Sequence, residues 1–203
     1  MGVHRQCIIS GVMKQHRPLR KCGVGRRAST GFARCRSRMS YRMPRKYMLL
    51  LITASVVVLC DQISKLYVAA VMWPHQSITV IERYIDITYV RNPGGAFGLF
   101  ARADRWMLRP LLLGLSAVAA VIILLIYRST PTDRLLVRLA FSLILGGAIG
   151  NLIDRIRFDE VIDFLDVHWR HYHWPAFNIA DAAISVGVAC LCWDLLFGKP
   201  AKR

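Results

Sequence analysis

The sequence predicts an α-helical integral membrane protein with four transmembrane helices, and three observations lead to this fold class. Of its 203 residues, 55% are hydrophobic, which is more than a soluble domain of this length usually carries. The formal charge of +16 is uneven, because the first 46 residues hold 13 of the 28 basic residues and no acidic one. The remaining chain is nearly neutral and contains four apolar stretches that approach the roughly 20 residues needed to cross a bilayer as a helix. This distribution argues against a folded nucleic-acid-binding domain.

The four apolar stretches are expected to be helices, because hydrocarbon offers no partners to backbone polar groups outside a helix. They cover about residues 47–73, 110–127, 135–153 and 178–198. Lys and Arg gather before the first stretch, between the second and third, and in the C-terminal residues 199–203, with Asp133 as the only acid among them. Since cytoplasmic loops carry the excess of basic residues, both termini are expected in the cytoplasm.

The two connections on the opposite side are expected to form structure outside the membrane. In residues 76–104, apolar and polar side chains alternate over Ser77–Val90, as is typical of strands, and an Asn-Pro-Gly-Gly turn follows at residues 92–95. Residues 155–176 contain amphipathic aromatic residues of the kind that lie at the level of lipid headgroups. These aromatic residues are Trp169, Tyr172 and Trp174. We therefore predict a small extracytoplasmic β element and an interfacial segment.

The basic segment before the first helix, residues 1–46, is expected to be a disordered cytoplasmic tail that is attracted to anionic lipids. We assign it no catalytic role. Two other interpretations stay open. Translation could begin at Met39, Met43 or Met48, or the first helix could be a cleaved signal peptide. The charged residues inside that helix argue against the second.

Ionisable residues inside the predicted helices call for an explanation. Inserting one charged side chain at the centre of a bilayer costs at least about 2.5–3.5 kcal/mol of free energy. Asp61 and Lys65 are four residues apart on one helix face, so they can form an ion pair that holds this helix to its neighbours. Asn151 and Asp154 share a face near the end of the third helix, with Arg155 adjacent. They are either a polar helix end or part of a site.

Two further aspartates form a candidate catalytic pair. Asp163 is enclosed by large apolar residues, which would raise its pKa by desolvation. Asp181 lies three residues after Asn178, where it can complete a helix cap. If the chain turns back to bring Asp163 and Asp181 together, the two carboxyl groups would share one proton and could activate water for peptide hydrolysis. We expect Asp163 to be the protonated member.

The chain resembles the bacterial lipoprotein signal peptidases (signal peptidase II), a family of four-helix aspartic proteases of the inner membrane. The resemblance spans about residues 47–198 and rests on five blocks in order. These are DQISK at 61–65, NPGGAFG at 92–98, GGAIGNLIDR at 146–155, VIDF at 161–164 and FNIAD at 177–181. By this resemblance Asp163 and Asp181 are the catalytic pair. The residues that would line or support the site are Asp61, Lys65, Asn92, Gly94, Asn151, Asp154, Arg155, Asn178 and Ala180.

The resemblance also implies an activity and a location. The family removes signal peptides from diacylglyceryl-modified prolipoproteins by cleaving before the lipidated cysteine, uses no metal or organic cofactor, and is inhibited by globomycin. We therefore expect prolipoproteins and membrane lipids as partners, no nucleic acid, and a monomer. The site would face the extracytoplasmic side of the bacterial inner membrane.

Three other functions remain open from the residues alone. Asp61, Asp163 and Asp181 could relay protons in a transporter, although no internal repeat is visible. A metal-dependent hydrolase could use the histidines beside Asp163 and Asp166, although their spacing matches no metalloprotease signature. These histidines are His168, His171 and His173. A scaffold protein would not need a carboxylate pair in apolar surroundings.

Overall fold

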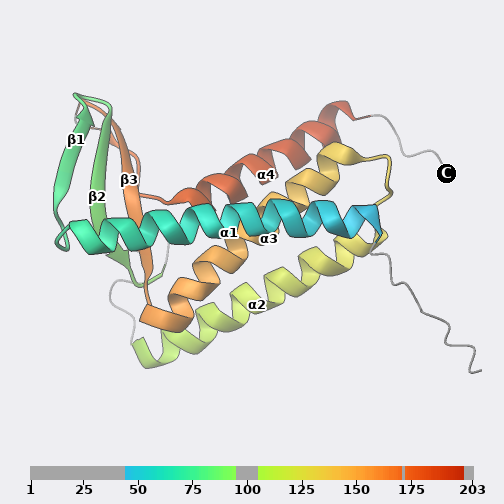
Figure 1. Ribbon diagram of the computed structural model, residues 1–203, viewed down its shortest axis with the longest axis horizontal. Coiled ribbons are helices and arrows are strands. Elements are labelled where there is room, and N and C mark those ends of the chain that lie inside the picture. The colour runs from blue at the N-terminus through green and yellow to red at the C-terminus, as the bar shows by residue number, and fades with distance from the viewer. Residues whose placement is uncertain (1–43, 95–104, 171, 199–203) are drawn as a thin grey trace, which may run out of the picture. The chain divides into compact units, whose positions relative to one another are not determined.

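The computed structural model describes residues 44–94, 105–170 and 172–198, and these residues form four long helices and four short strands (Figure 1). The helices are α1 (Arg45–Val71), α2 (Arg105–Ser129), α3 (Leu135–Phe158) and α4 (Ile179–Phe197). The strands are β1 (Ser77–Ile81), β2 (Ile85–Asn92), β3 (Val161–Trp169) and β4 (Tyr172–His173). Each of these four helices is long and apolar enough to cross a membrane, which confirms that part of the predicted fold class.

Some predictions concern residues outside these ranges. They are the tail up to residue 43, the last part of the first outer connection (95–104), His171, and the C-terminal residues 199–203.

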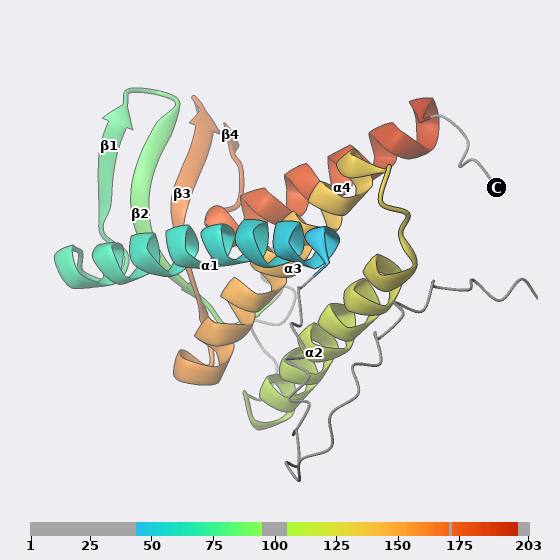
Figure 2. The ribbon, with the colours of Figure 1, turned by 45° about the vertical axis from the view of Figure 1, so that its right-hand side comes forward.

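Helix α3 packs against each of the other three helices (Figures 1 and 2). Glycines on α3 make this close approach feasible. A Cβ atom at Gly146 would lie 2.9 Å from Val57 Cβ and 3.0 Å from the backbone of Ala54 on α1, and one at Gly147 would collide with the carbonyl of Ala180 on α4. Small residues at helix contacts are the usual way in which membrane helices gain van der Waals packing.

Helix α2 leaves most of its apolar surface uncovered by protein. Its large side chains are mainly exposed, as at Leu111, Leu115, Val118 and Leu125. Lipid acyl chains would cover such a surface at no cost, because they are as apolar as leucine.

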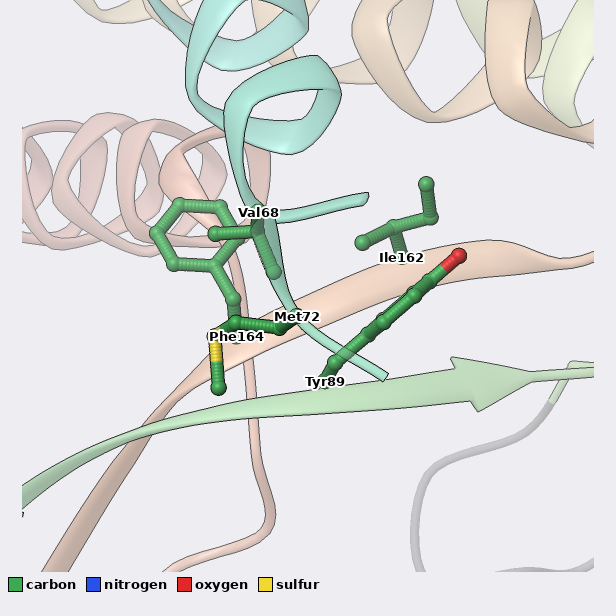
Figure 3. Packing of buried hydrophobic residues seen from close by; sticks show 5 residues of the cluster. All are labelled: Val68, Met72, Tyr89, Ile162 and Phe164. Carbon is green, nitrogen blue, oxygen red and sulfur yellow. The ribbon is translucent and has the colours of Figure 1, made fainter. Parts of the chain in front are cut away.

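The strands form an antiparallel sheet in the order β1-β2-β3-β4 at one end of α1 and α3 (Figure 2). A small apolar cluster joins the end of α1 to this sheet (Figure 3). Its buried members are Val68, Met72, Tyr89, Ile162 and Phe164. The cluster fixes β2 and β3 on the helices, and with them the polar residues that these strands carry.

The structure differs from the sequence-based expectation over residues 155–176. Helix α3 continues to Phe158, five residues beyond its predicted end, and stops where Asp159 takes a left-handed conformation with φ of 62°. Strands β3 and β4 then occupy most of the segment that we expected to be interfacial. The first four residues of β3 are buried in succession, so this half of the strand shows no alternation of buried and exposed side chains.

Candidate active site

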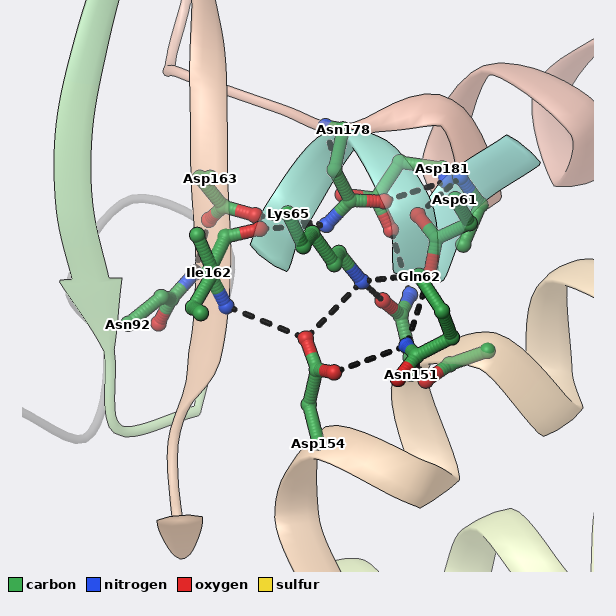
Figure 4. A network of polar contacts seen from close by, with 12 residues as sticks. Asp61, Gln62, Lys65, Asn92, Asn151, Asp154, Ile162, Asp163, Asn178 and Asp181 are labelled. Carbon is green, nitrogen blue, oxygen red and sulfur yellow. Dashed lines mark hydrogen bonds and ion pairs between the residues drawn. The ribbon is translucent and has the colours of Figure 1, made fainter. Parts of the chain in front are cut away.

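Asp163 and Asp181 lie on different elements that Asn178 connects. Asp163 belongs to β3 and is 3% exposed, whereas Asp181 belongs to the first turn of α4. The Asn178 side chain donates a hydrogen bond through Nδ2 to Asp163 Oδ1 at 2.7 Å and accepts one from the Asp181 backbone N–H at 2.9 Å. The chain therefore brings the two predicted catalytic residues onto opposite sides of a single amide (Figure 4).

A backbone return explains how residues 18 positions apart meet. After β4 the chain runs back along β3, where Phe177 N–H donates to the Leu165 carbonyl at 3.0 Å. In the same stretch the N–H groups of Phe164 and Leu165 donate to the Phe177 carbonyl. These bonds place Asn178, the next residue, directly beside Asp163.

The helix cap predicted at Asn178 is present. Asp181 Oδ2 accepts a hydrogen bond from the Asn178 backbone N–H at 3.4 Å, which completes a capping box with the bond from Asp181 N–H to the Asn178 side chain. The other oxygen of Asp181 accepts a hydrogen bond from Asn151 Nδ2 at 2.7 Å. Capping and a place beside Asp163 are thus combined in one side chain.

A cavity of about 560 Å³ opens next to the two carboxyl groups. Four residues predicted for the site line it: Asn92, Arg155, Asp163 and Asp181. Its remaining lining is mostly apolar and comes from the return segment and α4. Those residues are Trp174, Pro175, Ala176, Phe177, Ala182, Ser185 and Val186. A cavity with a few converging polar groups in an apolar wall is the usual form of a ligand site.

Burial, and after it the neighbouring charge of Asp181, raises the pKa of the Asp163 carboxyl from 3.8 to about 7. Hydrogen bonds from Asn92 and Asn178 and the charge of Lys65 act in the opposite direction. Asp163 can therefore hold a proton near neutral pH, as predicted from its apolar surroundings. Two carboxyl groups that share a proton can accept one from water and donate one to a carbonyl oxygen.

Behind the cavity lies a buried ion cluster formed by Asp61, Lys65 and Asp154 (Figure 4). Lys65 Nζ is 2.8 Å from Asp61 Oδ2 and 2.9 Å from Asp154 Oδ2, and none of the three side chains is more than 2% exposed. The ion pair predicted between Asp61 and Lys65 is confirmed, and Asp154 of α3 is its third member. The cluster holds α1 against α3. The backbone N–H of Ala180 donates to Asp61 Oδ1 at 2.9 Å, which connects α4 to the same cluster.

The ion cluster is linked to each member of the pair through one intervening residue. Asp154 Oδ2 accepts from the backbone N–H of Ile162, the residue before Asp163. Asn151 accepts from Lys65 Nζ at 3.0 Å while donating to Asp181. The cluster thus fixes both the strand that carries Asp163 and the side chain of Asp181.

Asn92 and Gly94 support Asp163 from β2 and the turn that follows. Asn92 Nδ2 donates to Asp163 Oδ2 at 3.1 Å, and Asn92 Oδ1 accepts from the Gly94 N–H at 3.0 Å. Gly94 has a φ of 123°, which residues with a side chain rarely adopt. The second bond fixes the amide orientation of Asn92, so that its N–H group faces the carboxyl.

Two residues at the site were not singled out from the sequence. Gln62 Nε2 lies within hydrogen-bonding distance of Asp61, Asp154 and the Gly150 carbonyl, so it bridges α1 and α3. Its position next to Asp61 in the first sequence block was the available signal. Ser116 of α2 accepts a hydrogen bond from Arg155 Nη1 at 3.3 Å, and its signal was a lone hydroxyl near the middle of an apolar run.

The histidines considered as metal ligands have other partners where they are described. His168 lies 3.3 Å from Asp86, and His173 lies 3.0 Å from Asp166. The two rings stack with centroids 4.7 Å apart. Within the described ranges, which omit His171, no group of three His, Cys, Asp or Glu side chains is arranged to hold a metal ion.

Comparison with known proteins identifies the family to which this geometry belongs. A sequence profile described as signal peptidase (SPase) II matches residues 53–197. The chain belongs to the signal peptidase II family. The resemblance inferred from the five sequence blocks is therefore confirmed, and the chain is a multi-pass bacterial membrane enzyme of the lipoprotein signal peptidase type.

Two lipoprotein signal peptidases share nearly half of the aligned residues with this chain, and a solved bacterial membrane enzyme shares 30%. The chain is 47% identical over 160 residues to the lipoprotein signal peptidase of Syntrophus aciditrophicus (strain SB), covering 79% of this chain and 99% of that protein. It is 43% identical over 154 residues to that of Geobacter metallireducens, covering 76% and 94%. A bacterial membrane enzyme solved by the in meso method at 2.3 Å resolution has a TM-score of 0.67 and 30% identity, over 76% of this chain and 93% of that chain.

Proposed function

We propose that the protein is an aspartic endopeptidase that removes signal peptides from diacylglyceryl-modified prolipoproteins, cleaving before the lipidated cysteine. The observation that carries the proposal is the pair formed by Asp163 and Asp181, which lines a cavity and is bridged by Asn178. Relatives that are 43% and 47% identical to this chain carry the name lipoprotein signal peptidase, which supports this choice of substrate.

In the proposed reaction the ionised carboxyl group accepts a proton from water as the water oxygen attacks the scissile carbonyl carbon. The protonated carboxyl group, assigned to Asp163, donates its proton to the carbonyl oxygen, which gives a tetrahedral diol. The diol then collapses: one hydroxyl returns its proton to Asp163, the bond between carbon and nitrogen breaks, and the proton that the other carboxyl group took from water goes to the leaving amine. Asn92 and Asn178 hold Asp163 in place through these steps.

The other predicted residues receive supporting roles in this proposal. Arg155 lines the same cavity, where its charge would act on groups that become anionic during the reaction. Asp61, Lys65, Asn151, Asp154 and Ala180 form the network behind the pair, and Gly94 shapes the turn that orients Asn92.

We further propose that the end of the bundle that bears the sheet faces the extracytoplasmic side of the inner membrane, with residues 47–198 as the peptidase domain. At the other end, Lys46 of α1 donates a hydrogen bond to the Arg128 carbonyl of α2, which places two basic residues together. The basic segment before α1 and the C-terminal residues 199–203 would then lie in the cytoplasm, in accord with the distribution of Lys and Arg. Such an orientation would present the cavity to a lipid-anchored substrate from the outer leaflet.

The test is cleavage of a diacylglyceryl-modified prolipoprotein by the purified protein in the presence of a chelator, with the new N-terminus read by mass spectrometry. We expect the wild type to cleave before the modified cysteine, and Asp163→Asn and Asp181→Asn to be slower by at least about 10²- to 10⁴-fold. Asp166→Asn is the matched control, because Asp166 lies on the same strand but pairs with His173 outside the cavity. An inactive wild type, or an active variant of the pair, would contradict the proposal.

A further inference from the structure

Helix α2 contributes a polar side chain to the site at Ser116. The predicted apolar run from Pro110 to Tyr127 contains no charged residue. Ser116 Oγ donates a hydrogen bond to the Leu112 carbonyl at 2.8 Å, and this bond uses its only proton. The lone pairs of the oxygen are then left for Arg155 Nη1, at 3.3 Å. The direction of both hydrogen bonds is therefore fixed.

Arg155 depends on this contact for its position. Its guanidinium lines the cavity together with Asp163 and Asp181, and the charges of both carboxyl groups act on it. Its Nε atom is buried without a hydrogen-bond partner among the described residues. Within that part of the chain, the hydrogen bond from Nη1 to Ser116 is the one that orients the guanidinium group.

The same turn of α2 also reaches the other side of the site. The Leu112 side chain lies against Gly94, so closely that a Cβ atom at Gly94 would overlap it. Gly94 in turn orients the Asn92 amide that donates to Asp163. The turn from Leu112 to Ser116 therefore contacts both supports of the carboxylate pair, one by packing and one by hydrogen bonding.

We infer that Ser116 is a positioning residue for the reaction: its hydroxyl holds the Arg155 guanidinium at the cavity wall beside the two carboxyl groups. The inference rests on the proposed function of this site. An anchored cation acts most strongly where negative charge develops in the transition state, so its loss should lower kcat more than it raises KM.

The experiment compares prolipoprotein cleavage by wild type, Ser116→Ala, Ser116→Thr and Ser129→Ala. We expect kcat of Ser116→Ala to fall by roughly tenfold with little change in KM, the size typical of a weakened hydrogen bond to a charged group. Threonine keeps a hydroxyl that can bond back to the preceding helical turn, so Ser116→Thr should recover most of the activity. Ser129 is the matched control, because it makes a similar hydrogen bond to the Ile126 carbonyl on the same helix, away from the site.

Each contrary outcome has a separate meaning. If Ser116→Ala retains full activity beside an active wild type, or if threonine restores no more than alanine, Ser116 does not position Arg155. A loss of the same size in Ser129→Ala would also overturn the inference, because the loss would then not depend on the contact between Ser116 and Arg155. An inactive wild type would instead overturn the proposed function, and this inference with it.

Discussion

The structure places two groups of aspartates side by side, and it neutralises the buried members of each group in a different way. Asp61 and Asp154 both contact Lys65, so each carboxylate in that cluster has a buried cation within 3 Å. Asp163 receives its hydrogen bonds from the neutral amides of Asn92 and Asn178 instead. The second group therefore reduces its buried charge by holding a proton, which is the property that hydrolysis of a peptide bond requires.

The two groups also differ in where they lie. The ion cluster is enclosed between α1, α3 and α4, with the Ala180 N–H and the Gln62 amide as further donors. The pair comes from a strand and a helix cap and lines a cavity. The enclosed ion cluster is suited to stabilising the packed helices. The pair, at the wall of a cavity, is accessible to water and substrate. The following three predictions examine this division.

The largest effect on stability is expected at Lys65. Lys65→Met would leave Asp61 and Asp154 buried without a cation, which typically costs about 3–5 kcal/mol in the free energy of unfolding. Thermal or denaturant unfolding in detergent would measure it. Arg109→Met is the matched control, because Arg109 and Asp159 form an ion pair at 2.6 Å with both side chains about half exposed, and such pairs contribute at most about 1 kcal/mol. Equal losses in both variants would refute the proposed role of the buried cluster.

A second effect is expected in the pH dependence of stability at Asp163. Its pKa is about 7 in the folded protein and near 3.8 when the chain is unfolded, so the folded state keeps a proton that the unfolded state loses. The contribution of Asp163 to stability is therefore greatest below about pH 4, falls as the pH rises towards 7, and then levels off. At about 1.4 kcal/mol for each tenfold difference in proton affinity, the total is about 4 kcal/mol.

The measurement is the free energy of unfolding from pH 4 to pH 8 for wild type and Asp163→Asn. The variant has no group to titrate at this position, so its curve should be flatter than that of the wild type between pH 4 and 7. Parallel curves would mean that Asp163 is ionised at neutral pH. The rate of cleavage should also fall as the pH rises through about 7, because the pair then loses its shared proton.

A smaller effect is expected where α3 approaches the ion cluster. A Cβ atom at Gly150 would lie 2.7 Å from Asp61 Oδ2 and 3.3 Å from the Ala180 side chain, so Gly150→Ala should lower stability by about 1–3 kcal/mol. Gly114→Ala is the control, because a Cβ atom there meets nothing within 4 Å. Alanine favours the helix over glycine, so this variant should be neutral or up to about 1 kcal/mol more stable. The unfolding midpoints of the two variants would measure these changes in stability. An unchanged midpoint for Gly150→Ala would show that the neighbouring side chains can move to make room for the added methyl group.

The sequence predicted most of the parts but not their arrangement. Four apolar runs predicted four helices, and the ionisable residues inside them predicted the ion pair of Asp61 and Lys65, because such groups must be paired in an apolar setting. The cap at Asn178 could be predicted for a similar reason, since helix capping is local. The meeting of Asp163 with Asp181 could not be derived from local rules, because it depends on backbone hydrogen bonds between Phe177 and residues of β3.

Strand β3 and the contact of Ser116 show where sequence patterns lose information. Since β3 begins with four buried residues, its apolar run has no period of two and cannot be distinguished from other buried segments. A serine in an apolar helix commonly bonds to its own backbone, as Ser116 does to the Leu112 carbonyl, so nothing local indicates that it also accepts from Arg155. Both features depend on which elements become neighbours.

The most direct test of the division between the two groups measures cleavage and unfolding on the same preparations of Asp163→Asn and Lys65→Met. We expect Asp163→Asn to lose at least about 10²-fold in cleavage at neutral pH while unfolding at or above the wild-type temperature. Lys65→Met should lose several kcal/mol of stability. An Asp163→Asn variant that cleaves at the wild-type rate, or that loses as much stability as Lys65→Met, would contradict the account.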